Sequence, residues 1–509
     1  MHRYILLSIL ISLVLILLGM SRGFDISDEG LYALLAVPDQ ENVAGIFNYD
    51  LFFKLLHKVL GVEFGLIGLR ILRLLSCFVS AFALAFFWNN FTGSSKNGWI
   101  KFLISLCGVF ASYGFLPQTL SYNSINLMCG CMWLAVISYR SLDTRKVVLL
   151  GFILALLFYS KITVCFLLGL LTLIILWKAK GSRKMLKWLI VLAIPLLIVE
   201  LLFFRILGDS GILRALEAKG MLAFRPDYHF LSLAKYTFVG FLWSSIVILP
   251  FLLAGYLNRI GSPFSKWAFI FGICVLILVS YATTITDEIN HIVLLSTAAA
   301  TAYCLLSGKS IKLDFHQKAL LTLLFAFPFI LHFGSNVYFL RLGIHYWGFW
   351  MIALLIIREL EYKSNDRINF GVAIMTVILI GNGIWINPFE QESLWLARRK
   401  WIYKKGKEIK LTSDQITLLQ TIEPFVSGQR ELLALYRIPG ITYLLGKMSP
   451  KSPGFWDSNQ LLYFMDSSDQ LDCILLYPKD SLPSIFKGDF SKKNIQAPMG
   501  DQIQILWRK

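Results

Sequence analysis

Long apolar runs recur through the first 386 residues, and they limit the possible folds more than any other feature of the sequence. Hydrophobic side chains make up 57% of the 509 residues. A helix of about 20 apolar residues crosses the core of a bilayer, and an ordinary soluble domain does not contain many such runs. We therefore expect a polytopic α-helical membrane protein with about thirteen transmembrane helices. The expected ranges are 4–22, 67–88, 99–116, 120–139, 147–159, 162–177, 188–207, 236–257, 267–285, 289–307, 319–333, 345–357 and 368–386.

The positions of Lys and Arg indicate how these helices are oriented. Cations gather in alternate connections, whereas the outer turns at 117–119 and 286–291 contain none. The positive-inside rule then places the amino terminus in the cytoplasm and everything after Asn387 outside. This alternation holds only if the short runs 147–159 and 162–177 cross separately, rather than as one long helix. The cation-rich connections lie near residues 3, 96–101, 140–146, 178–187, 259–266, 309–318 and 358–367.

The net charge of +17 is explained by this topology, so we expect membrane lipids and no nucleic acid as partners. The eight cysteines show neither a disulfide framework nor zinc-ligand spacing. The segment Met1–Gly23 has a basic start and an apolar run without an A-x-A cleavage pattern. We interpret it as a retained membrane anchor.

An acidic cluster follows the first apolar run. Asp25, Asp28 and Glu29 lie within the stretch Phe24–Tyr32. Carboxylates at a membrane boundary are costly to desolvate, so they either serve a function or face water in a loop. Both interpretations remain open for this stretch alone.

The rest of the first outer loop predicts an amphipathic helix over about 47–60, which either lies in the headgroup layer or packs on the bundle. Its polar face carries Lys54, His57 and Lys58. Arg70 and Arg73 open the next span, where cations either extend to the headgroups or bind a phosphate.

Several polar residues on the outer side could bind a ligand. Lys161 has no acidic neighbour in sequence, so its ammonium needs an anion from another helix or from a ligand. The turn at Gly334–Asn336 could present backbone N–H groups to an anion, and Arg341 follows it. Tyr122 and Asn123 either bind a sugar or cap a helix.

Two other outer segments carry charges. In residues 208–235, including Arg214 and Arg225, we expect most charges to be solvated. Asp287 lies with an adjacent glutamate in a turn that also contains His291, which could hold a metal but is also typical of a solvated turn.

The composition changes at Asn387, where the apolar runs stop. We expect residues 1–386 to form the membrane domain and 387–509 a small extracytoplasmic α/β domain. The latter contains no recognisable catalytic motif. Strands are predicted at 432–436, 441–445, 473–477 and 503–507, with a helix at 413–421.

Outer carboxylates, outer cations and a helical scaffold together suit one reaction. In it, a sugar carried on a lipid phosphate is attacked by an acceptor hydroxyl. A carboxylate accepts the hydroxyl proton, cations neutralise the leaving phosphate, and a groove between helices holds the lipid tail. A single displacement inverts the anomeric centre and needs one base.

The stretch Asp28-Glu29-Gly30-Leu31-Tyr32-Ala33-Leu34-Leu35-Ala36 resembles the D-E-x-x-Y-x-x-x-A motif of GT-C fold glycosyltransferases. It is most similar to the branch of protein O-mannosyltransferases and bacterial lipid A aminoarabinose transferases. Gly151–Lys161 is similar to a G-x-x-x-G…T-K hairpin of that branch, with Ser160 for Thr and the second Gly missing. Ile438–Lys447 is similar to an outer-domain P-x-x-Y-x-L-G/T-G-R strand. The expected topology also fits this branch.

The resemblance implies an inverting glycosyltransferase in a bacterial inner membrane, with a polyprenyl-phosphate sugar as donor and a lipid, glycan or protein as acceptor. Asp28 would be the base and Glu29 its support. Where relatives have a His or Lys followed by prolines, this chain has Asn48-Tyr49-Asp50. The implied substrate-binding residues are Tyr32, Asn48, Tyr49, Lys161, Asn336 and Arg341.

The need for a metal cofactor stays open, because this branch generally works without one and oligosaccharyltransferases of the same fold use one. Asp25 and Asp287 are the candidate ligands, and Asp25 could instead compete with Asp28 as base. Two other functions also stay open. One is a lipid or solute transporter, although the charges cluster at span ends rather than along a path. The other is a polysaccharide polymerase or ligase, which would use Arg214 and Arg225.

Overall fold

The computed structural model is mostly helical. It describes residues 2–43, 47–94, 97–222, 229–284, 290–308, 312–361, 366–404, 406–465, 471, 473–477, 480–486, 489–497, 500 and 502–508.

The helical part of the chain precedes the first strand. Its helices are α1 (His2–Gly19), α2 (Asp28–Leu35), α3 (Asp50–Leu60), α4 (Leu66–Thr92), α5 (Gly98–Tyr113), α6 (Tyr122–Ile137), α7 (Thr144–Ser160), α8 (Ile162–Lys180), α9 (Met185–Leu207), α10 (Gly211–Leu222), α11 (Phe230–Arg259), α12 (Ser265–Ala282), α13 (His291–Ser307), α14 (Phe315–His332), α15 (Phe339–Leu342), α16 (Trp347–Leu360) and α17 (Asp366–Ile380). Two 3-10 turns, Ser182–Lys184 and Gly343–Tyr346, precede α9 and α16, and a π-helical turn, Gly381–Ile386, follows α17.

The carboxyl-terminal part combines strands and short helices. These elements are β1 (Arg399–Lys404), β2 (Lys407–Leu411), α18 (Ser413–Val426), β3 (Leu433–Leu435), α19 (Pro439–Leu444), α20 (Ser458–Phe464), β4 (Cys473–Leu476), β5 (Phe490–Gln496) and β6 (Gln502–Arg508). Strands β1 and β2 form an antiparallel pair. The other strands form a sheet of order β3-β4-β6-β5, in which only β3 and β4 run parallel.

Every one of the expected transmembrane ranges contains a helix, including the short pair that becomes α7 and α8. Within the described residues, eight helical segments are long and apolar enough to cross a membrane. Shorter apolar helices at Arg3–Gly19, Gly98–Tyr113, Tyr122–Ile137 and His291–Ser307 accompany them. This is the architecture of a polytopic helical membrane protein, as the sequence predicts.

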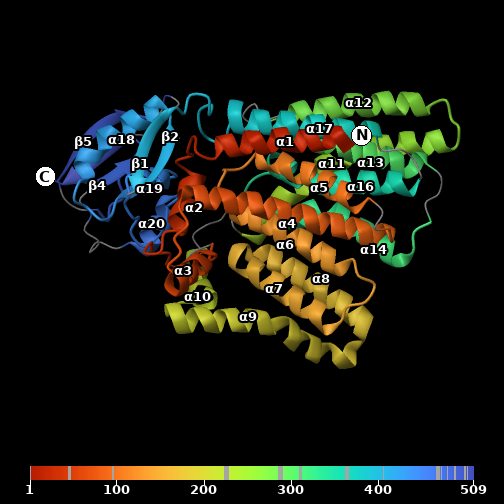
Figure 1. Ribbon diagram of the computed structural model, residues 1–509, viewed down its shortest axis with the longest axis horizontal. Helices are drawn as coiled ribbons and strands as arrows, with labels where there is room; N and C mark the ends of the chain where they lie inside the picture. The colour runs from red at the N-terminus through yellow and green to blue at the C-terminus, as the bar shows by residue number, and fades with distance from the viewer. Residues whose placement is uncertain are drawn as a thin grey trace.

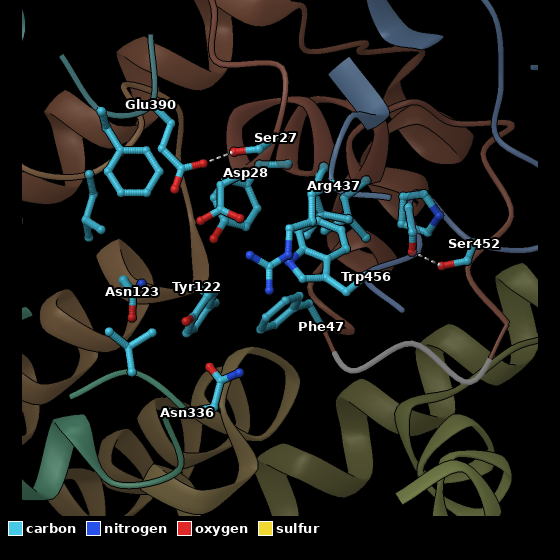
Figure 2. A pocket seen from close by; sticks show the side chains of 18 of the residues that line it. Ser27, Asp28, Phe47, Tyr122, Asn123, Asn336, Glu390, Arg437, Ser452 and Trp456 are labelled. Carbon is cyan, nitrogen blue, oxygen red and sulfur yellow. Dashed lines mark hydrogen bonds between the residues drawn. The ribbon is translucent and has the colours of Figure 1, made fainter. Parts of the chain in front are cut away.

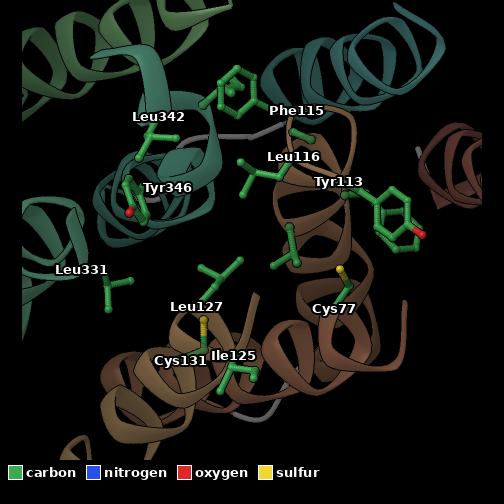
Figure 3. Packing of buried hydrophobic residues seen from close by; sticks show 14 of the residues in the cluster. Cys77, Tyr113, Phe115, Leu116, Ile125, Leu127, Cys131, Leu331, Leu342 and Tyr346 are labelled. Atoms are coloured by element: carbon green, nitrogen blue, oxygen red, sulfur yellow. The ribbon is translucent and has the colours of Figure 1, made fainter. Parts of the chain in front are cut away.

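The helices pack through a continuous apolar core. Figure 3 shows part of it, where Leu127 and Cys131 of α6, Leu331 of α14 and Tyr346 lie around a shared interior. The same cluster continues into α18 and the strand β6 of the carboxyl-terminal part. Because the core is shared, the two parts of the chain support each other.

The acidic stretch lies where these two parts meet. In Figure 1 the amino end of α1 lies away from the strands, whereas α2 lies between the helical bundle and the strands. Helix α2 crosses α19 so closely that a Cβ atom built on Gly30 would lie 2.3 Å from the backbone N and Cα of Gly440. The Gly440 N–H also donates to the Ile26 carbonyl over 2.7 Å. The first loop is therefore fixed directly against the carboxyl-terminal part.

The predicted strands at 432–436, 473–477 and 503–507 and the helix at 413–421 are confirmed by β3, β4, β6 and α18. The strand predicted at 441–445 is wrong, because residues 441–444 lie within the helix α19 and Leu445 caps its end. Pro439 occupies its first turn, where the missing N–H is tolerated. The amphipathic segment forms helix α3 and packs on α9, and its last turn exposes Val59 and Leu60.

Candidate active site

A cavity of about 340 Å³ opens where α2, the start of α6, the segment around α15 and the carboxyl-terminal loops meet. Its walls come from parts of the chain more than 400 residues apart. Figure 2 shows Asp28, Tyr122, Asn336, Arg437 and Trp456 facing this space. Of the residues predicted from sequence to form the site, the cavity brings together Asp28, Tyr32, Asn336 and Arg341.

Asp28 is the first residue of α2, so its carboxylate stands at the positive end of that helix. It is only partly exposed, and its side chain makes no hydrogen bond or ion pair with another described residue. Burial and the nearby Glu390 carboxylate raise the pKa of Asp28 from 3.8 to about 7, although Arg437 and Arg341 act in the opposite direction. A carboxylate with a pKa near neutrality can both accept and release a proton.

The carboxylate of Glu390 faces the same cavity beside Asp28 (Figure 2). Its Oε2 atom lies 2.8 Å from the hydroxyl of Ser27, and that hydroxyl is also 2.8 Å from Oδ1 of Asp25. Glu390 has a φ of 44°, which is unusual for a residue other than glycine. Such strained residues are concentrated at functional sites.

The supporting role predicted for Glu29 needs correction. Its Oε1 accepts from Nε of Arg70 over 3.0 Å, and its Oε2 accepts from Nη2 over 2.9 Å. Both side chains are 0% exposed, and Glu29 does not line the cavity. Arg70 also donates to the carbonyls of Met20, Arg22 and Gly23. Glu29 and Arg70 therefore join the first loop to α4, and the guanidinium of Arg70 is bonded to Glu29 and to backbone carbonyls.

Arg73, the other arginine of α4, is also buried. It donates to the carbonyls of Ser112, Tyr113 and Leu116, at the end of α5. Both arginines thus satisfy backbone groups that have no partner at helix ends.

Tyr32, Asn336 and Arg341, which the family resemblance implies as substrate-binding residues, line the cavity. The Tyr32 ring lies 6.3 Å from the Tyr122 ring, which in turn stacks on Phe47 at 4.4 Å. These three rings form an aromatic wall. Ser121, rather than Tyr122 or Asn123, caps α6, because its hydroxyl accepts from the N–H of Ser124. Tyr122 and Asn123 are thereby left facing the cavity.

Lys161 does not line the cavity. Its Nζ donates to the carbonyls of Leu331 and His332 over 2.9 and 3.2 Å, and the residue is only 8% exposed. The ammonium therefore satisfies the last carbonyls of α14. The anion predicted as its partner is replaced by these backbone oxygens.

Asn48 and Tyr49 also lie outside the cavity. The side-chain oxygen of Asn48 is 3.4 Å from Nη1 of Arg214, and the Tyr49 ring packs on Phe53. Arg214 itself is buried, with a 2.7 Å ion pair to Asp50, so the expectation of a solvated charge is wrong for this residue. Arg225 lies outside the described residues.

The candidate metal ligand Asp25 is a capping residue. Its Oδ1 accepts from the N–H of Ser27, and its Oδ2 accepts from the N–H of Glu29. Within the described ranges, no group of three or more His, Cys, Asp or Glu side chains is placed to hold a metal ion. Asp287 lies outside those ranges.

Sequence reasoning missed Glu390, Arg437 and Trp456 as site residues. Glu390 follows the last apolar run, and Arg437 directly precedes Ile438–Lys447, the stretch that is similar to the outer-domain motif. The sequence signal that could have identified them is their position next to the last apolar run and next to the outer-domain motif. Nothing in local sequence connects them with Asp28.

An apolar groove of about 780 Å³ lies among α8, α11, α13, α14 and α16. Phe333, directly after α14, lines this groove, and Asn336 lines the cavity. Three residues of extended chain reach about 10 Å, so groove and cavity are close neighbours. Comparisons of the chain with protein-family models, with curated proteins and with solved structures found no match.

Proposed function

We propose that this protein is an inverting glycosyltransferase that moves a sugar from a polyprenyl-phosphate donor to an acceptor hydroxyl. The observation that supports it most is the cavity itself. One partly buried carboxylate, Asp28, faces it together with two guanidinium groups, and an apolar groove lies beside it. Base, phosphate contacts and lipid site are the parts that this reaction requires.

The donor would bind with its lipid tail in the groove and its phosphate near Arg341. The groove is lined almost entirely by apolar side chains such as Phe238, Phe241 and Phe329. These suit isoprenoid units, whose burial contributes about 0.8 kcal/mol per CH₂. The turn that carries Asn336 joins the groove-lining helix α14 to α15, so the phosphate would emerge beside Arg341.

The reaction is a single displacement. The acceptor oxygen forms a bond to the anomeric carbon, while the bond from that carbon to the phosphate oxygen breaks. The bonding electron pair stays on the lipid phosphate, which leaves with one more negative charge, and Arg341 neutralises it. The hydroxyl proton passes to the carboxylate of Asp28, which later releases it to water.

The pKa of Asp28, raised to about 7, suits this role. A general base works best when its pKa lies near the operating pH, because it is then ionised yet still basic. Glu390 contributes by raising this pKa, and the aromatic wall of Tyr32, Phe47 and Tyr122 offers ring faces to the sugars.

We propose the topology that the sequence predicts, with about thirteen spans, a cytoplasmic amino terminus and an extracytoplasmic part from Asn387 onward. The cavity then opens on the outer side of the membrane, where a lipid-linked sugar and an envelope acceptor can meet. A bacterial inner membrane fits this arrangement.

The test is a transfer assay with purified protein in lipid nanodiscs. Polyprenyl-phosphate sugars, with an envelope extract as acceptor, are followed by mass spectrometry of the glycan products. Asp28→Asn should abolish product formation while the protein still elutes as a single species. Asp39→Asn is the matched control, because this exposed carboxylate lies in the same loop but outside the cavity. Product formation by Asp28→Asn at the rate of the control would refute the proposal.

A further inference from the structure

Arg437 is held in place by its backbone while its side chain stays exposed in the cavity. It lies between β3 and α19 with a φ of 62°, in the left-handed region that few residues other than glycine adopt. Its N–H donates to the carbonyl of Phe455 over 3.2 Å. The guanidinium makes no hydrogen bond or ion pair with any side chain or carbonyl among the residues that the structure describes. Strain around an unpaired cation indicates a function.

Arg437 and Arg341 approach the cavity from different parts of the chain. Arg341 belongs to α15, beside the groove proposed for the lipid tail, whereas Arg437 comes from the carboxyl-terminal part. Both arginines lower the pKa of Asp28, and Arg437 lowers it more strongly than Arg341 does. In an inverting displacement, the base and the leaving phosphate lie on opposite sides of the anomeric carbon. Because Arg341 lies in the segment that follows the groove-lining helix α14, we assign Arg341 to the leaving phosphate and Arg437 to the acceptor side.

An aromatic surface accompanies Arg437. In Figure 2 its guanidinium lies next to the rings of Trp456 and Phe47, below Asp28. The backbone of Trp456 is held by its main-chain N–H, which donates to Oε1 of Gln460 over 2.9 Å. An indole ring binds the apolar face of a sugar, and a guanidinium beside it binds a carboxylate or phosphate on the same sugar through charged hydrogen bonds.

We propose that Arg437 and Trp456 form the acceptor subsite, and that the acceptor is a glycan with a carboxylate or phosphate close to the hydroxyl that receives the sugar. This inference rests on the proposed function and adds the chemical class of its acceptor. Arg437 holds the anion, Trp456 holds the sugar ring, and Asp28 accepts the proton of the neighbouring hydroxyl. No covalent step beyond the displacement above is needed.

The test measures binding of defined sugars to the full-length protein in nanodiscs by isothermal titration. The probes are glucuronate, glucose 6-phosphate and glucose, which separate a carboxylate from a phosphate and both from a neutral sugar. One charged hydrogen-bonded contact should give the anionic probes about tenfold tighter binding or more. Arg437→Gln should remove this advantage, and Arg437→Lys should keep part of it. Arg430→Gln, an exposed arginine outside the cavity, is the control and should change nothing.

The same proteins are titrated with undecaprenyl phosphate, which probes the donor side alone. We expect Arg437→Gln to bind it like the unchanged protein and Arg341→Gln to bind it at least tenfold more weakly. Unchanged binding of the anionic sugars by Arg437→Gln would overturn the acceptor subsite. Loss of undecaprenyl phosphate binding in Arg437→Gln would also overturn it, because Arg437 would then be a donor contact. If the unchanged protein binds no undecaprenyl phosphate but binds anionic sugars through Arg437, the proposed donor fails and the anion site stands.

Discussion

The ion pair between Glu29 and Arg70 should contribute strongly to stability, and this can be measured by replacing Arg70 with Met. The variant leaves the Glu29 carboxylate buried without its partner. Removing one member of a buried ion pair typically costs about 3–5 kcal/mol. It also removes the donors to the carbonyls of Met20, Arg22 and Gly23. Since folded domains are stable by only about 5–15 kcal/mol, a loss of about 4 kcal/mol or more should be plain.

The assay is chemical unfolding of the full-length protein in mixed detergent micelles, followed by tryptophan fluorescence. Glu29→Gln should lose stability in the same direction, and its transfer activity should fall in parallel with the folded fraction. Lys400→Met is the control, because the Lys400–Glu408 pair is 64% and 52% exposed and such pairs contribute about 1 kcal/mol at most.

Two results would refute this reasoning. A loss below about 1 kcal/mol in Arg70→Met would mean that the pair does not hold the first loop on α4. Complete loss of transfer in Glu29→Gln with normal unfolding would mean that Glu29 takes part in the reaction, as the family resemblance implies.

Three further predictions follow from the cavity and its supports. Transfer should increase as the pH rises through about 7, because Asp28 must be ionised. Since the folded state raises the pKa of this carboxyl, the free energy of unfolding falls as the pH rises from 3.8 to about 7. Asp28→Asn should therefore be more stable than the unchanged protein above pH 7, by up to about 4 kcal/mol. Near pH 4 the two proteins should be equally stable. Gly30→Ala should lower the melting temperature and activity by forcing α2 from Gly440, whereas Gly169→Ala, with open space around it, should do neither. Ala302→Trp should fill the apolar groove and weaken binding of undecaprenyl phosphate in the titration without changing binding of glucose.

The sequence predicts the helices in the thirteen expected ranges because each of those ranges is an apolar run, and length and hydropathy determine such segments. It also predicts that Asp28 and Arg341 serve one site, which the cavity supports by bringing them together. The strand predicted at 441–445 fails because β-branched residues favour strands only where a sheet accepts them. Here Pro439 and the close contact of Gly440 with the first loop favour a helix instead.

Local sequence patterns could not predict which residues far apart in the chain interact with one another. Lys161 has no acidic neighbour in sequence, yet the carbonyls at the end of α14 satisfy its ammonium. Asp28 and Glu29 are adjacent, so sequence assigns them a joint role. The helix turns their side chains apart, toward the cavity and toward Arg70. Arg437 could not be connected with Asp28 before the chain was folded.

The most direct test of the central claim is an electron cryo-microscopy structure of the protein in nanodiscs with a non-hydrolysable polyprenyl-phosphonate sugar. We predict density for the sugar between Asp28 and Arg341, with the phosphonate on the Arg341 side and the lipid tail along the groove formed by α11, α13 and α14. The Asp28 carboxylate should lie on the side of the anomeric carbon opposite the phosphonate. Density for the sugar and phosphonate at another surface, with the Asp28 cavity empty, would contradict the account.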